Sequence, residues 1–430
     1  MDSPPNGRIA IVGGVRTPFA KAFTDLNNLN ASDLAKLTIQ ELVQRWELPG
    51  SEVDQVIWGS VIPTMSNLNI GREAPLALGW HNVPGFTLGQ QCASGIQAVT
   101  SAAQAIGAGQ AQVIVAGGSE SMSNTPVPHR KRLIEALQGM MKARSMGQRL
   151  AALKKVKLGD FVPRPPALEE PSTGLTMGQH GEIMAQINGI SRKDQDAYAV
   201  QSHQKAAAAR KAGRVNDDLV PVPIPPKYSS HFAIDNLIRE DTDEEQMGRL
   251  RPVFDRKHGT LTAGNSSALT DGAAVVLVMS ESRAKALGFA PWGYLKAYRY
   301  VAIPPNPQLL LGPAYSTPAV LDAANMELSD IDLLEIHEAF AAQVLSVTQK
   351  LESEQFARDE LGRSAAVGKV DWDRLNVNGG SLAYGHPFAA TGGRLVINLL
   401  QELGRRDKEN GLLTICTANA MGVSMILERA

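Results

Sequence analysis

Short apolar strands alternate with helices in two separate stretches of this 430-residue chain. This alternation is the feature that most restricts the fold. In the first stretch, from residue 8 to about 124, the pattern predicts strands and helices in turn: strands at 8–12, 56–58 and 112–116, and helices at 32–46 and 94–107. Ser32 is the expected N-cap of the first helix. Helices between short strands imply crossover connections, so the chain is predicted to form an α/β sheet.

The second stretch begins near residue 252 and repeats the pattern, with strands predicted at 273–279, 331–336 and 411–416 and a helix at 389–403. The two stretches also share a faint echo. A helix opens just after Cys92 in the first and just after Gly385-His386-Pro387 in the second, and the next strand ends at a small or reactive residue, Gly118 or Cys416. A duplicated α/β unit would explain why Cys92 and His386 precede corresponding helices.

The segment between these stretches, 125–251, is richer in proline and in charge. From Arg130 to Lys157 it holds nine Lys or Arg and one acidic residue, Glu135. Apolar residues of this part fall roughly on one helical face: Leu133, Leu137, Met140, Met141, Leu150 and Leu153. We expect an inserted, partly helical domain with a basic amphipathic segment. A solvated helix packed on its own domain and a surface for anions or membrane both fit this pattern.

Composition excludes several classes of protein. The formal net charge is −1, so charge gives no case for nucleic acid. The two cysteines, Cys92 and Cys416, are too few and too distant for a disulfide scaffold, and two free thiols in a reducing compartment are expected. The N-terminus carries no cationic leader, and no apolar stretch reaches the ~18 residues that span a bilayer. A cytoplasmic protein is the expectation.

Four residues could carry chemistry. Cys92 lies at a predicted helix N-terminus, where amide dipoles would lower its pKa and make it a nucleophile, although a small buried cysteine fits as well. His386 could deprotonate a thiol or be an ordinary turn histidine. His337, with Glu338, follows a predicted strand, where α/β sites form, but an exposed loop would look the same. Cys416 ends a strand, with the same ambiguity as Cys92.

The glycine-rich turns match neither a phosphate-binding loop nor a dinucleotide fingerprint. The scattered histidines show no metal-ligand spacing, so neither a metal nor a cofactor is expected.

Five motifs, in order and across nearly the whole chain, resemble the signatures of the thiolase family. They are Gln91-Cys92-Ala93-Ser94-Gly95, Gly117-Gly118-Ser119-Glu120-Ser121-Met122-Ser123, Ala263-Gly264-Asn265-Ser266-Ser267 with Thr270-Asp271-Gly272-Ala273, His337-Glu338-Ala339-Phe340, and Asn378-Gly379-Gly380-Ser381 leading to Gly385-His386-Pro387.

The resemblance implies two duplicated βαβαβαββ halves in a layered α/β/α/β/α arrangement. An N-terminal domain would span 1–124, completed by 252–283. A loop domain would be inserted at 125–251, and a C-terminal domain would span 284–430.

The resemblance also implies roles. Cys92 would carry the acyl group, and His386 would activate Cys92 and then the thiol of coenzyme A. Cys416 would exchange a proton at the α-carbon, and His337 would help to hold a thioester oxygen. The amides of Cys92 and Ala418 would form an oxyanion hole, and Ser267 would lie near the pantetheine arm. Coenzyme A would be a substrate.

The turn after Cys416 departs from the family, which usually has glycines there. This chain reads Thr417-Ala418-Asn419-Ala420, and alanine and asparagine adopt positive φ less freely than glycine. The geometry of this turn therefore stays open.

Many thiolases have asparagine at the first position of the His337 motif. A histidine there is similar to the branch that contains the β-subunit of the fatty-acid oxidation trifunctional complex and its bacterial relatives. The runs 142–150 and 361–368 look like parts of those subunits. This implies cleavage of 3-oxoacyl-CoA in fatty-acid β-oxidation, at least a dimer, a hydratase/dehydrogenase α-subunit as partner, and contact of the basic segment with membrane or that partner.

Other functions stay open at this point. A biosynthetic acetyl-CoA acetyltransferase would use the same residues. A non-catalytic acyl-CoA-binding or scaffold subunit would explain the altered turn. A decarboxylating condensing enzyme is disfavoured, because such sites replace the C-terminal cysteine that Cys416 supplies.

Overall fold

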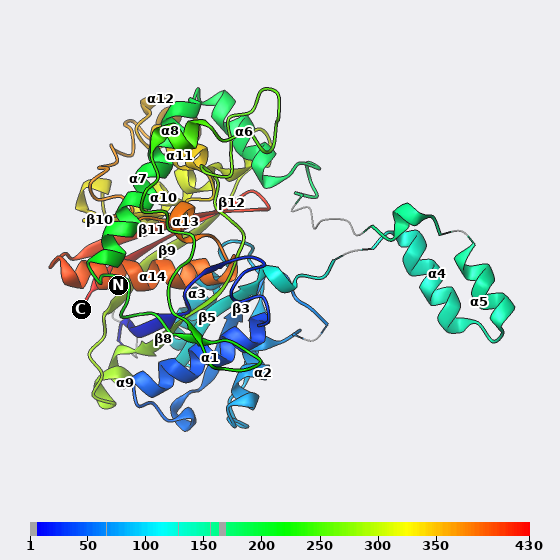
Figure 1. Ribbon diagram of the computed structural model, residues 1–430. Helices are drawn as coiled ribbons and strands as arrows, with labels where there is room; N and C mark the ends of the chain where they lie inside the picture. Colours follow the sequence, from blue (N-terminus) through cyan, green and yellow to red (C-terminus); the bar gives the residue numbers. More distant parts are fainter. Residues whose placement is uncertain (1–6, 66, 128, 155, 163–168) are drawn as a thin grey trace. The chain divides into compact units, whose positions relative to one another are not determined.

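A computed structural model describes residues 7–65, 67–127, 129–154, 156–162 and 169–430 (Figure 1). Residues 1–6 lie outside this description. The expectation that the N-terminus carries no cationic leader partly concerns these residues. The chain forms two compact units, one made of 1–124 with 170–430 and the other of 125–169. Among the described residues, no helix has both the length and the apolar character to cross a membrane.

In the described part of the chain, a ten-stranded mixed sheet runs through the larger unit, in the order β10-β11-β12-β9-β1-β8-β5-β3-β4 with β2 beside β8. Its strands are β1 (Ile9–Arg16), β2 (Ala20–Lys21), β3 (Gln55–Gly59), β4 (Gly85–Leu88), β5 (Val113–Ser121), β8 (Thr270–Ser280), β9 (Gly293–Ala302), β10 (Leu333–Ile336), β11 (Asn410–Thr417) and β12 (Met421–Arg429). A further pair, β6 (Val222–Pro223) and β7 (His231–Phe232), lies apart.

The sheet is duplicated about the antiparallel pair β1 and β9. In the first half β5 pairs parallel with β3 and antiparallel with β8, which pairs antiparallel with β1. In the second half β11 pairs parallel with β10 and antiparallel with β12, which pairs antiparallel with β9. The duplicated α/β fold predicted from the sequence is therefore confirmed.

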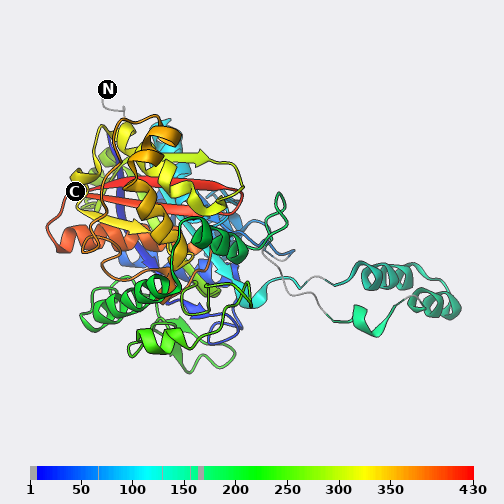
Figure 2. The same cartoon turned by 90° about the horizontal axis from the view of Figure 1, so that it is seen from above.

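Two helices, α3 (Ser94–Gly107) and α14 (Ala389–Arg405), lie between the two halves of the sheet (Figures 1 and 2). They share one apolar core with inward-facing residues of β5 and β8 and of β11 and β12. On the outer faces, α1 (Ala31–Arg45) and α2 (Ile70–Ala77) cover the first half, and α10 (Gly312–Ala324) and α11 (Ala341–Leu351) cover the second. Cys92 and His386 precede the two inner helices, so the echo in the sequence reflects equivalent positions.

The remaining helices of the larger unit are α6 (Met177–Ile187), α7 (Arg192–Lys211), α8 (Glu244–Gly248), α9 (Glu281–Ala286), α12 (Glu354–Leu361) and α13 (Ser381–Tyr384). The predicted bounds of α3 are confirmed at both ends. The predicted N-cap of α1 is wrong. Asn30 caps this helix and forms a reciprocal pair with Asp33, whereas Ser32 lies buried within the first turn.

The smaller unit holds α4 (Lys131–Lys142) and α5 (Met146–Leu153), which pack on each other. Leu133 and Ala136 are buried, but Leu137, Met141 and Leu150 are exposed. This unit covers a shorter segment than the predicted insertion, because residues 170–251 belong to the larger unit. The division at 124, 251 and 284 stays a prediction.

Candidate active site

Cys92 lies in a tight turn between β4 and α3 and is partly buried. Ser94 shapes this turn, because its Oγ accepts from the Gln90 N–H at 2.8 Å and donates to the Gln91 carbonyl at 2.7 Å. Gln91 adopts a φ of 49°, so the backbone bends sharply just before the cysteine. The sulfur is thus presented beside the start of α3.

His386 lies in the loop that leads into α14 and is 4% exposed. Its N–H donates to the Ala268 carbonyl at 2.9 Å, and its ring Nδ1 lies 2.6 Å from Thr391 Oγ1, in the first turn of α14. Gly385 has a φ of 87°, and a Cβ there would meet the Thr270 side chain at 2.3 Å. Glycine at this position lets the histidine loop lie close against β8.

His337 directly follows β10 and is fully buried. Its N–H donates to the Thr414 carbonyl of β11 at 2.9 Å, and its ring Nδ1 lies 3.0 Å from Ser381 Oγ. Glu338 is engaged by other partners. Its carboxylate accepts from Tyr198, Ser202, Asn376 and the Leu382 N–H, and so ties α7 to the loops that carry the histidines.

Cys92, His337 and His386 come together although they are far apart in sequence. The sulfur and one ring nitrogen of each histidine lie within 4.8 Å of one another. The ring centroids of the two histidines are 4.2 Å apart. Both Nε2 atoms are buried and have no hydrogen-bond partner among the described residues. With both Nδ1 atoms engaged, the Nε2 atoms are left for a substrate.

Cys416 belongs to the same cluster. It is the penultimate residue of β11, is 1% exposed, and interacts electrostatically with Cys92. Burial and the neighbouring Cys92 sulfur raise the pKa of the Cys416 thiol well above its usual value. At neutral pH it is therefore a thiol with a proton to give.

Two backbone amides face the Cys92 sulfur, those of Cys92 itself and of Ala418. Both favour the thiolate, but burial outweighs them and raises the pKa of Cys92 to about 11. The expectation that the helix N-terminus lowers this pKa is wrong. The free-energy cost of burying the thiolate charge exceeds the stabilisation that hydrogen bonds from two N–H groups provide.

Burial also keeps both histidines neutral. It lowers the pKa of His386 to about 3 and that of His337 well below its ordinary value, and the nearby cation of Arg394 acts in the same direction. Arg394 is itself buried and donates from Nη2 to Ser381 Oγ at 3.2 Å.

These partners assign the proton on His337. Arginine only donates, so Ser381 Oγ accepts from Arg394. Among the described residues Nδ1 of His337 is the one acceptor that the Ser381 hydroxyl meets, so we infer that the hydroxyl donates its hydrogen bond to this nitrogen. The ring proton of His337 then lies on Nε2 and faces the cluster. Sequence reasoning named Ser381 only as part of a motif, without a role, and missed Arg394 and Thr391. Arg394 could have been found, because an arginine on the apolar face of the helix predicted after Gly-His-Pro is unusual and indicates a buried partner.

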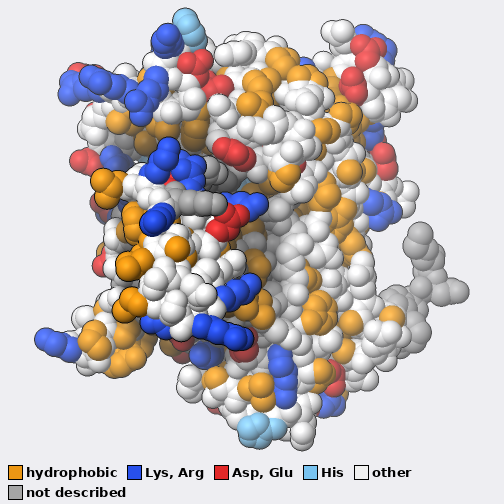
Figure 3. Space-filling model, turned by 90° about the vertical axis from the view of Figure 1, so that its right-hand side faces the viewer, with side chains coloured by type: hydrophobic (Ala, Val, Ile, Leu, Met, Phe, Trp, Pro, Cys, Tyr) orange, Lys and Arg blue, Asp and Glu red, His pale blue; other side chains and the backbone are white. Residues whose placement is uncertain are grey.

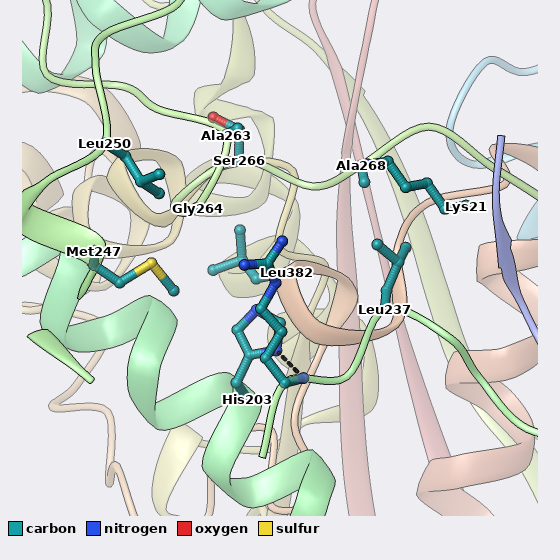
Figure 4. Close-up of a pocket in the computed structure, with 11 residues that line it drawn as sticks. Lys21, His203, Leu237, Met247, Leu250, Ala263, Gly264, Ser266, Ala268 and Leu382 are labelled. Atoms are coloured by element: carbon teal, nitrogen blue, oxygen red, sulfur yellow. Dashed lines mark hydrogen bonds between the residues drawn. The ribbon is translucent and has the colours of Figure 1, made fainter. Parts of the chain in front are cut away.

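Ser267 lies outside the cluster. Its N–H donates to the Ala339 carbonyl at 3.0 Å, while its neighbour Ser266 lines a cavity of about 160 Å³ (Figure 4). That cavity has an apolar wall and two cations, Lys21 and Arg239. It reaches the active-site loops through Leu382 and Ala268, the residue whose carbonyl accepts from the His386 N–H. No pattern in the sequence pointed to Lys21 or Arg239.

Within the described residues, Cys92, His337 and His386 are also the one group spaced to hold a metal ion. The buried cation of Arg394 beside the two histidines opposes a second positive charge there.

Comparisons with known proteins agree with this geometry. The family model described as "Thiolase, N-terminal domain" matches residues 9–282, and "Thiolase, C-terminal domain" matches 289–429. A 3-ketoacyl-CoA thiolase of Pseudoalteromonas translucida is 45% identical, over 100% of this chain and 99% of its own length. One of Escherichia fergusonii is 46% identical, over 98% of this chain and 97% of its own.

Solved structures show the same fold. The acetyl-CoA acetyltransferase of Bacillus anthracis superposes with a TM-score of 0.85 at 33% identity, covering 98% of this chain and 99% of its own. Human mitochondrial 3-ketoacyl-CoA thiolase in complex with CoA superposes with a TM-score of 0.84 at 29% identity, covering 98% of each chain. From its sequence, its fold and these matches, the chain belongs to the thiolase family.

Proposed function

We propose that this chain is a 3-ketoacyl-CoA thiolase that cleaves 3-oxoacyl-CoA with coenzyme A to acetyl-CoA and a shortened acyl-CoA, in fatty-acid β-oxidation. The observation that carries the proposal is the meeting of the Cys92 sulfur with one nitrogen of each of two buried, neutral histidines. The names of the full-length relatives support the substrate class.

In the first half-reaction, Nε2 of His386 takes the proton of Cys92 as the sulfur attacks the 3-oxo carbon. The resting cysteine is a thiol, because its pKa is about 11, so proton transfer accompanies the attack. The N–H groups of Cys92 and Ala418 face the sulfur, which supports the proposal that they hold the new oxyanion.

Cleavage of the C2–C3 bond leaves the enolate of acetyl-CoA. Nε2–H of His337 and the protonated His386 donate to its oxygen, while the Cys416 thiol protonates its carbon. His386 then returns its proton to the Cys416 sulfur. Neutral again, it deprotonates the thiol of incoming coenzyme A, which takes the acyl group from Cys92, and the proton ends on the Cys92 sulfur.

We infer that the cavity beside Ser266 admits coenzyme A. Its apolar wall suits a pantetheine arm, and Lys21 and Arg239 supply charge for phosphates (Figure 4). Nδ1 of His203 accepts from the backbone N–H of Arg239 at 3.2 Å and so holds the backbone that carries this cation. Ser267, one residue from this cavity, is proposed to lie near the same arm.

Thiolysis rates with acetoacetyl-CoA and with a series of longer 3-oxoacyl-CoA substrates test the proposal. We expect activity to extend to long chains. Refusal of every chain longer than acetoacetyl-CoA would instead favour a biosynthetic acetyl-CoA acetyltransferase, the activity named for the similar Bacillus anthracis structure.

A non-catalytic acyl-CoA-binding subunit is tested by the mass of the intact protein after incubation with an acyl-CoA. We expect an acyl adduct on the wild-type protein and none on Cys92→Ser. An unmodified wild-type protein without thiolysis would contradict the enzyme.

We further propose that the chain belongs to the branch of the trifunctional β-subunits. It would act in the cytoplasm as at least a dimer, beside a hydratase/dehydrogenase α-subunit. Support comes from His337 and from the smaller unit, whose exposed Leu137, Met141 and Leu150 accompany the basic residues of 130–157. We propose that this unit contacts a membrane surface.

A further inference from the structure

The turn between β11 and β12 places the Ala418 amide beside Cys92 with a backbone that suits glycine. Asn419 and Ala420 have φ values of 64° and 54°, in the left-handed region that L-residues adopt at a cost. Glycines would adopt this turn freely, but they would not by themselves fix it. Something else must hold the turn in the one conformation that presents the amide.

The peptide unit that joins Ala418 to Asn419 is held at both ends. Its carbonyl oxygen accepts from Thr417 Oγ1 at 2.6 Å. Its N–H donates to Glu170 Oε2 at 2.8 Å, across 249 positions of sequence. This peptide directly follows the Ala418 N–H that faces the Cys92 sulfur. Fixing its plane therefore restricts the rotation that would turn the Ala418 amide away.

Glu170 is rigid enough to act as the anchor. It is 3% exposed, and its second carboxylate oxygen accepts from Ser172 Oγ at 2.9 Å. Its backbone closes a compact turn, with its N–H on the Leu175 carbonyl at 2.8 Å and its carbonyl on the Gly174 N–H at 2.8 Å. Burial acts to raise the pKa of Glu170, but the hydrogen bonds from Asn419 and Ser172 outweigh it and hold the pKa below its usual value. The anchor is therefore a carboxylate at neutral pH.

We propose that Glu170, with Thr417 at the opposite end of the same peptide, is a positioning residue that holds the Ala418 amide over the reacting carbonyl. The two side chains take over the work of fixing a turn whose residues are not glycines. The proposal rests on the function proposed above, since it assumes that this amide stabilises the oxyanion formed at Cys92.

Two substitutions at the anchor test this. Glu170→Ala removes the acceptor. The single-turnover rate of Cys92 acylation should fall by at least about tenfold, a smaller loss than the ~10²–10³ that follows removal of a whole oxyanion donor. KM for coenzyme A should change little. Glu170→Gln keeps an oxygen at the same reach, so its rate should stay within about threefold of wild type. Glu169→Ala, at an exposed neighbour, is the matched control and should leave the rate unchanged.

Thr417→Val gives a second route if Glu170→Ala folds poorly. It keeps the shape of the side chain but frees the Ala418 carbonyl, and the acylation rate should fall in the same way with an unchanged thermal midpoint.

Wild-type acylation in both Glu170→Ala and Thr417→Val would overturn the proposal, as would losses that only follow the folded fraction. Glu170→Gln as slow as Glu170→Ala would overturn the hydrogen-bonding role. Failure of the proposed function looks different, because the wild-type protein itself would then show no acyl adduct on Cys92.

Discussion

At the scale of single residues, two histidines with rings 4.2 Å apart are prepared for opposite tasks by the groups on their Nδ1 atoms. Nδ1 of His337 accepts a hydrogen bond from Ser381, which Arg394 polarises, and the ring is therefore proposed to offer Nε2–H as a donor. His386 meets Thr391, whose oxygen can accept the Nδ1 proton and leave Nε2 free as a base.

Ser381→Ala should lower kcat at least about tenfold with little change in KM. The substitution frees Nδ1 of His337, so the ring no longer holds Nε2–H toward the enolate, although the donor itself remains. Steady-state kinetics with acetoacetyl-CoA measure this. Ser346→Ala is the control, because that buried hydroxyl only donates to the Ala342 carbonyl within α11. Equal kcat values for both variants would contradict the role of Ser381.

Acid should destabilise the folded protein through His386. Its pKa is about 3 in the folded state and near 6.5 when unfolded, so the unfolded chain binds the extra proton between these values. Stability is therefore complete above about pH 6.5 and falls as the pH drops, by up to about 1.4 kcal/mol per pH unit.

Urea unfolding of the wild type and of His386→Gln at about pH 7.5 and about pH 5 checks this. The wild type should lose about 2 kcal/mol more than the variant on going to the lower pH. Equal losses would mean that this histidine is not held neutral by the fold.

At the scale of elements, glycines bring the inner helices α3 and α14 close enough for Cys92 and His386 to meet. A Cβ on Gly95 would lie 2.5 Å from the Ala389 carbonyl oxygen, and one on Gly118 would lie 2.3 Å from it. Both contacts are with backbone at the start of α14, which cannot move without carrying the His386 loop. The small residues after Cys92 thus serve helix packing.

Gly95→Ala should therefore cost about 1–3 kcal/mol of stability and also lower kcat, because the added methyl displaces α14. Gly107→Ala is the matched control in the same helix, since a Cβ there meets nothing within 4 Å. Thermal unfolding and thiolysis rates of the two variants give the comparison. A fully active, fully stable Gly95→Ala protein would contradict this account of the packing.

At the scale of the whole molecule, the duplicated sheet supplies the site from both halves. Cys92 comes from the first half, and His337, His386 and Cys416 come from the second. The cluster therefore forms only when α3 and α14 are enclosed between the two halves. The smaller unit contributes none of these residues. On the face shown in Figure 3, Lys and Arg side chains lie among exposed hydrophobic ones.

The proposed membrane contact predicts that the protein sediments with vesicles containing anionic phospholipid. Binding should weaken between about 50 and about 300 mM salt, because the basic residues act through screened charge. The double variant Leu137→Glu/Met141→Glu should bind less. Leu76→Glu, at an exposed leucine of α2 in the larger unit, is the control. Equal sedimentation of the double variant and the Leu76→Glu control would contradict the proposal that the smaller unit contacts the membrane.

Much of the fold could be predicted from the sequence, because the signals are local. Apolar periodicity and small residues gave the bounds of α3, and β10, β11 and α14 lie where apolar runs predicted them. The N-cap of α1 was missed because Asn30, Ser32 and Asp33 are all able to cap, and only the path of the incoming chain selects among them.

The sequence by itself determined which residues are proposed to carry the chemistry, since a thiol or an imidazole is the same group wherever the chain places it. The tertiary structure alone decided their protonation. Burial raises the pKa of Cys92, although the nearby helix start predicted the reverse, and Arg394 and Ser381 set the state of His337. Desolvation and long-range hydrogen bonds depend on what packs around a group, and Glu170 reaching Asn419 across 249 positions shows why no local pattern contains that information.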